Sequence, residues 1–98
     1  MPPSATEAVD ETYSITKIQT VIDTIWGIPP SSREDVIRAI DRLQFEPRPD
    51  GHLVTRFGAY SIVTFVVKST QPPYLLTYQV DEEKKKIFVV AVGAKTFN

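Results

Sequence analysis

The sequence predicts an α+β domain in which two short helices near the N-terminus precede an antiparallel sheet. Apolar residues recur at helical spacing between residues 18 and 45. From residue 52 to residue 92, runs rich in β-branched and aromatic residues alternate with short turns. Helices followed by sequential strands with short connections are typical of an antiparallel sheet with the helices on one face.

The composition limits the size, the compartment and the chemistry. The 98 residues suffice for one domain, and 42% of them are hydrophobic. The lack of cysteine excludes disulfides, thiolate metal sites and a cysteine nucleophile, and it fits a reducing cytoplasm. The formal net charge of −1 lacks the basic excess that nucleic-acid binders usually carry. We therefore expect a cytoplasmic protein with no cofactor, no metal and no membrane partner.

The first third of the chain contains a tail, a strand and a helix. Residues 1–11 are polar, acidic and proline-containing, which predicts a disordered N-terminal tail before a single domain over residues 12–98. The β-branched run 12–17 predicts an edge strand. A short helix is expected over residues 18–26, with Trp26 packed between it and the sheet. The apolar positions of this helix are Ile18, Val21, Ile22 and Ile25.

A second helix is predicted over residues 32–45. Ser31 or Ser32 can cap its N-terminus, and Pro47 disfavours helical geometry at Glu46. The side chains expected on the sheet are Val36, Ile37, Ile40 and Leu43, and those expected to face water are Arg33, Arg38, Asp41 and Arg42.

Four strands are predicted in the second half of the chain. Turn-forming residues occupy 48–51 and 69–73, and a charged tip occupies 81–85. The predicted strands cover residues 52–56, 59–68, 74–80 and 86–92.

The order of these segments resembles the RelE/ParE superfamily of bacterial toxins. Residues 31–51 are similar to that family's second helix and the proline-containing loop after it. Residues 74–93 are similar to its C-terminal hairpin, with a Tyr-x-Val-Asp sequence and a closing Val-Gly. Residues 13–33 have the spacing of its first strand and helix, so the resemblance covers most of residues 13–95.

The resemblance implies a small curved antiparallel sheet packed against two N-terminal helices. It also implies a toxin of a type II toxin–antitoxin system, held inactive by a cognate antitoxin whose segment wraps over the domain. RelE-like members cleave messenger RNA in the ribosomal A site, and ParE-like members inhibit DNA gyrase without being hydrolases. The ribosome and its messenger RNA are therefore further candidate partners, and a homodimer stays open.

The catalytic residues that the resemblance implies are mostly missing. RelE-like toxins cleave RNA without a metal, using lysines and arginines on the concave face of the sheet and a C-terminal tyrosine. This chain has Ser61, Val63 and Leu75 where cations are expected, and Phe97 near the position of the tyrosine. Lys95 keeps the expected charge and is the one catalytic candidate.

Other residues are candidates for binding RNA or a partner. Arg48, Arg56 and Lys68 could form a phosphate-binding patch, or could be ordinary solvated charges. Tyr60, Tyr74 and Tyr78 could stack on bases, although tyrosines at alternate strand positions more often pack in a core. The single histidine, His52, has no visible catalytic partner in the sequence.

Three functions follow as hypotheses. The first is a toxin-like protein that inhibits translation or another central process mainly by binding. The second is a ribosome-dependent mRNA endoribonuclease that uses Lys95 with nearby basic residues. The third is a non-toxic protein-interaction module that kept the fold.

Overall fold

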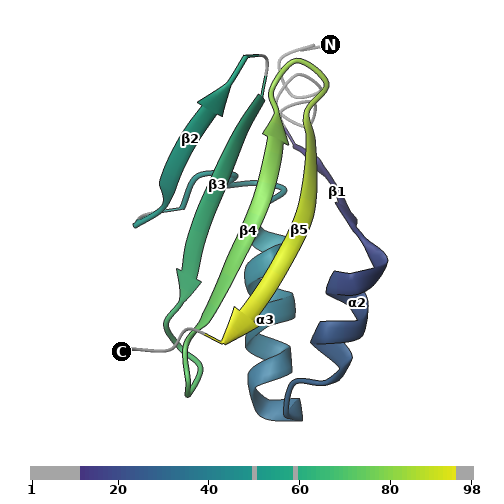
Figure 1. Cartoon of the computed structure of the whole chain (residues 1–98), viewed down its shortest axis with the longest axis vertical. Helices are drawn as coiled ribbons and strands as arrows, with labels where there is room; N and C mark the ends of the chain where they lie inside the picture. The colour runs from purple at the N-terminus through teal and green to yellow at the C-terminus, as the bar shows by residue number, and fades with distance from the viewer. Residues whose placement is uncertain (1–11, 50, 59, 95–98) are drawn as a thin grey trace, which may run out of the picture.

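Figure 1 shows the computed structural model of the chain, which describes residues 12–49, 51–58 and 60–94. The predicted tail, Lys95 and Phe97 lie outside these residues. Each predicted helix and strand is present, with ends shifted by a few residues. The elements are β1 (Ser14–Lys17), α2 (Gln19–Trp26), α3 (Pro30–Arg42), β2 (Leu53–Phe57), β3 (Tyr60–Val67), β4 (Tyr74–Asp81) and β5 (Lys86–Ala94).

The five strands form one mixed sheet in the order β1-β5-β4-β3-β2. From β2 to β5 each strand is antiparallel to the next, as expected. The predicted edge position of β1 is confirmed, but β1 runs parallel to β5, with Ser14 opposite Lys86 and Lys17 opposite Val89. The expectation of a wholly antiparallel sheet is therefore wrong at this edge. The chain between β1 and β5 contains both helices and three strands, so it is long enough for the two strands to run in the same direction.

The helices and one face of the sheet share the hydrophobic core. In Figure 1 α3 passes behind β5, and α2 lies beside α3 on the side of β1. Along β4 every second side chain is buried, the pattern of a strand with one face on a core. The core comprises Tyr13, Val21, Ile25, Ile28, Val36, Ile40, Leu43, Val63, Val67, Tyr74, Leu76, Tyr78, Val80, Ile87 and Val89.

The start of α3 differs from the prediction. Pro29 is extended and occupies the N-cap position, no side chain caps the helix, and Pro30 is its first residue. Proline suits this position because it has no N–H to satisfy and its φ is already helical. The predicted cap at Ser31 or Ser32 is therefore wrong, since both residues lie inside the first turn.

Three side chains around the helices lie elsewhere than predicted. Ile37 is 39% exposed, whereas its neighbour Val36 is fully buried. Trp26 is 66% exposed and not packed against the sheet, because it follows the buried Ile25 by one residue and so points about 100° away. Arg33 does not simply face water. Its guanidinium lies 5.0 Å from the centre of the indole ring and donates hydrogen bonds to the carbonyls of Trp26 and Ile28.

No helix in the described part of the chain is long and apolar enough to span a bilayer.

Candidate functional site on the open face of the sheet

The sheet has one face turned away from the helices, here called the open face. Successive strand residues point to opposite sides. Because Ser61, Val63 and Val67 are buried on the helix side, their neighbours along β3 point to the open face. On β3, β4 and the start of β5, the residues of the open face are Tyr60, Ile62, Thr64, Val66, Leu75, Thr77, Gln79, Asp81, Lys86 and Phe88.

The centre of the open face carries no charged side chain among the described residues. Across β3 and β4 its opposing pairs are Ile62 with Gln79, Thr64 with Thr77, and Val66 with Leu75. Its charged members, Asp81 and Lys86, are opposite each other at one end of the sheet. These charges have opposite signs, so the described part of this face offers no cluster of cations to a phosphate.

The positions compared with the family's lysines need a correction. Ser61 and Val63 are 1% and 0% exposed on the helix side, so neither could present a cation to a substrate on the open face. The outward positions of that strand segment are Ile62 and Thr64, which are also uncharged. Leu75 does lie on the open face, as reasoned from the sequence. Whether the family's lysines are compared with Ser61 and Val63 or with Ile62 and Thr64, the described part of this strand offers no cation.

Arg48 is fixed on the opposite side of the sheet. Its Nη2 lies 3.3 Å from Ser61 Oγ, to which it donates, and it forms an ion pair with Glu82. Beside it, the hydroxyl of Tyr78 donates a 2.7 Å hydrogen bond to the carbonyl of Pro47. These contacts fasten the loop after α3 to the helix side of the sheet. Burial raises the pKa of Tyr78 above its ordinary value, and the nearby Arg48 charge partly opposes this shift.

The structure does not gather the predicted basic patch. Arg56 is opposite Ser61, which places it on the helix side of β2 near Arg48. Lys68 follows Val67 at the other end of β3. Arg48 and Arg56 therefore lie together, whereas Lys68 is separate from both.

Tyr60 and Tyr74 lie on opposite faces. Tyr60 is 41% exposed on the open face. Tyr74 is 8% exposed and belongs to the core, so its ring has no free face for a base. His52 is held in its loop by a 2.9 Å contact from Nδ1 to the carbonyl of Pro49. Within the described ranges no group of histidine, aspartate and glutamate side chains could hold a metal ion.

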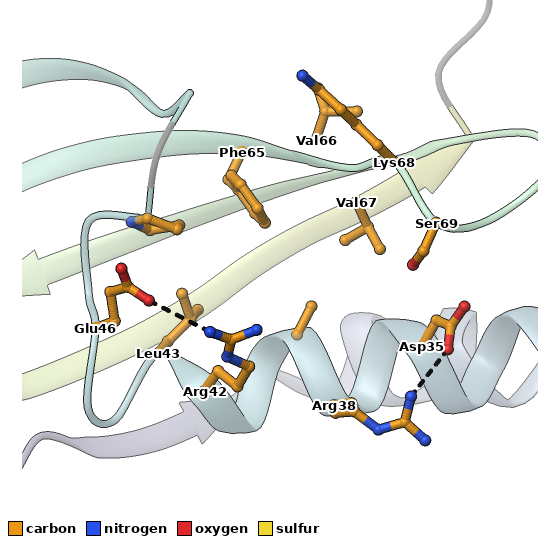
Figure 2. A pocket seen from close by; sticks show the side chains of 12 residues that line it. Asp35, Arg38, Arg42, Leu43, Glu46, Phe65, Val66, Val67, Lys68 and Ser69 are labelled. Carbon is orange, nitrogen blue, oxygen red and sulfur yellow. Dashed lines mark hydrogen bonds and ion pairs between the residues drawn. The ribbon is translucent and has the colours of Figure 1, made fainter.

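A second surface feature was not predicted from the sequence. A cleft of about 560 Å³ separates α3 from the end of β3 (Figure 2). Arg38 and Arg42, which were expected only to face water, stand along its helix side. Their spacing of four residues places them on one side of the helix. This spacing was the one signal in the sequence that could have indicated that they act together. The distant strand that completes the cleft could not be read from that spacing.

Comparisons with known proteins identify the fold. Neither the protein-family models nor the curated protein sequences contain a match to this chain. Among solved structures, the archaeal RelE–RelB complex from Pyrococcus horikoshii superposes with a TM-score of 0.77 at 16% identity, over 89% of this chain and 99% of the other.

Two bacterial structures are also similar. The isolated RelE toxin of E. coli gives a TM-score of 0.66 at 20% identity, over 88% of this chain and 87% of the toxin. A RelBE toxin–antitoxin complex from Mycobacterium tuberculosis gives a TM-score of 0.63 at 17% identity, over 86% of this chain and 99% of the other. This chain therefore has a RelE-like toxin fold.

Proposed function

We propose that this chain is the toxin-like component of a toxin–antitoxin pair, and that it inhibits translation or another central process by binding rather than by cutting RNA. The RelE-like fold supports the proposal of a toxin-like protein. The observation that carries the choice of mechanism is the uncharged centre of the open face.

RNA cleavage without a metal depends on electrostatic stabilisation by side chains. Metal-independent RNA cleavage builds negative charge on a pentacoordinate phosphorus, and prearranged cations stabilise that charge. Losing one such donor typically costs ~10²–10³ in rate. The half-buried side chains of Ile62, Val66, Leu75 and Phe88 instead suit an apolar partner surface.

A cognate antitoxin is the expected partner, and the cytoplasm is the expected compartment. Two of the similar structures are RelE–RelB or RelBE complexes. The uncharged centre of the open face is consistent with contact to a protein chain, because it can be buried without leaving unpaired charges.

One observation favours a ribosome-dependent endoribonuclease as a second candidate. Tyr74 is opposite both Val67 and Ala94, so the end of β3 and the end of β5 lie at the same end of the sheet. Lys68 follows the first of these ends and Lys95 follows the second in the sequence. Two lysines near this end would be a residual cationic site on which catalysis could depend.

A growth assay separates the toxin from a non-toxic interaction module that kept the fold. The protein is overproduced in its host, with and without the neighbouring open reading frame. We expect growth arrest that co-expression relieves. Unimpaired growth, with the protein shown to be folded and abundant, would support the non-toxic module instead.

A cleavage assay separates binding from catalysis. A defined message on ribosomes is incubated with the protein or with Lys95→Ala, and we expect little or no cleavage by either. Robust cleavage that Lys95→Ala abolishes would overturn the binding mechanism and establish the endoribonuclease.

A further inference from the structure

The cleft between α3 and β3 lies beside an unpaired stretch of sheet edge. The ladder between β2 and β3 ends at the pair Leu53–Thr64, whereas β3 continues to Val67. No other described strand pairs with residues 65–67 on that side. The ladder stops there because the chain turns just before β2, at Gly51, whose φ of +86° is readily adopted by glycine.

An unpaired strand stretch offers backbone N–H and C=O groups to an added strand. A segment that continued the line of β2 would lie along residues 65–67. One row of its side chains would then point toward α3, since alternate residues of a strand face opposite sides. Figure 2 shows Phe65 and Val67 pointing from β3 toward the helix, where they form the apolar side of the cleft.

The helix side of the cleft carries two exposed arginines. The side chains of Arg38 and Arg42 are 65% and 74% exposed. Arg38 pairs with Asp35 at 3.1 Å, and Arg42 pairs with Glu46 at 3.7 Å (Figure 2). Exposed pairs of this kind contribute little stability, so a second carboxylate can share or replace the first at small cost.

The charge around the cleft favours an acidic ligand. Its described lining has three cationic side chains, those of Arg38, Arg42 and Lys68, against two acidic ones. An RNA strand fits less well, because a polyanion gains affinity from several cations along its path, and the two acidic side chains of the lining leave it only a small positive excess. A peptide can satisfy the backbone edge and the guanidinium groups together.

We propose that this cleft binds an extended, acidic segment of a partner protein. The segment adds as a strand beside residues 65–67 and places carboxylates against Arg38 and Arg42. This inference deepens the proposed function by naming where a partner segment docks and what chemistry it has, and it rests on that function for the partner being an antitoxin.

The binding test uses a fluorescein-labelled heptapeptide that alternates glutamate with valine, with a lysine–valine peptide of the same length as its control. Fluorescence anisotropy with the full chain measures both affinities. We expect the glutamate peptide to bind at least about tenfold more tightly, and Arg38→Gln or Arg42→Gln to weaken it about three- to tenfold. Lys84→Gln, at the exposed tip of the β4–β5 hairpin, removes an equal charge far from the cleft and should change nothing.

Amide hydrogen exchange locates the bound peptide. We expect slower exchange at residues 65–67 when the glutamate peptide is present. Equal binding of the two peptides, indifference to both arginine variants, or protection only at β1 or β2 would overturn the proposal. Tighter, arginine-dependent binding of a single-stranded oligouridine would overturn it in favour of RNA. The growth assay is independent of this readout, so either proposal can fail without the other.

Discussion

Replacing Tyr78 with phenylalanine tests whether the buried hydroxyl fastens the loop after α3. Tyr78 is fully buried and its hydroxyl donates to the carbonyl of Pro47 at 2.7 Å. The substitution keeps the ring in the core but leaves that carbonyl without its donor. We expect Tyr78→Phe to lower the free energy of unfolding by ~1–2 kcal/mol near pH 8.

The same variant should change how stability depends on pH. Burial raises the pKa of Tyr78 in the folded state, so the hydroxyl stays protonated after the unfolded chain has begun to lose its proton near pH 10. The contribution of Tyr78 is therefore complete below pH 10. Above it, this contribution falls by about 1.4 kcal/mol per pH unit until the folded-state pKa is reached. Phenylalanine has no such loss, so the stability advantage of the native protein should vanish near pH ~11.

Urea unfolding followed by far-ultraviolet circular dichroism, at pH 8, 10 and 11, measures both effects. The other tyrosines and the lysines titrate in both proteins, so their contributions cancel in the difference between them. A difference that stays constant from pH 8 to pH 11 would refute the reasoning, because it would mean that the folded protein ionises Tyr78 as readily as the unfolded chain does.

Two further predictions concern the core and the loop. Ile40→Ala should cost about 2–5 kcal/mol because Ile40 is 1% exposed, whereas Ile37→Ala, at a 39% exposed position, should cost under about 1 kcal/mol. Similar costs by thermal or urea unfolding would contradict the assigned helix face. Arg48→Ala should destabilise by about 1 kcal/mol, through a partly exposed ion pair with Glu82 and a buried serine hydroxyl left without its donor. Glu82→Gln should cost less, and a larger loss than in Arg48→Ala would contradict that account.

Local patterns predicted the elements and most of the core. The alternation along β4 correctly marks Tyr78 as a packing residue, and helical spacing correctly places Val36 and Ile40 inside. Ile37 fails because it follows Val36 by about 100°, at the boundary of the buried stripe. Periodicity gives the direction of a side chain, but it does not give the width of the surface that covers it.

Long-range contacts were beyond the reach of these patterns. Arg48 looks like a free loop cation in the sequence, and its partner Glu82 lies 34 positions further along the chain. Trp26 is contacted by Arg33, seven positions away, and helical spacing did not indicate this contact. For the candidate site, the family resemblance suggested too few cations, but which face each residue occupies required the register of the strands. The role of Lys95 stays a prediction.

Translation produces the edge strand β1 and its neighbour β5 at opposite ends of the synthesis of the sheet. Translation releases β1 first and β5 last, and yet these two strands are neighbours in the sheet. While the chain is growing, β1 has no strand to pair with, and its backbone groups stay bonded to water or to chaperones. Pairing at this edge therefore waits until β5 has been synthesised, and it has the slow, non-local character of high contact order. A product truncated before Lys86 would leave β1 and the outer side of β4 without their shared neighbour, and both would be open to proteases and to pairing with other chains.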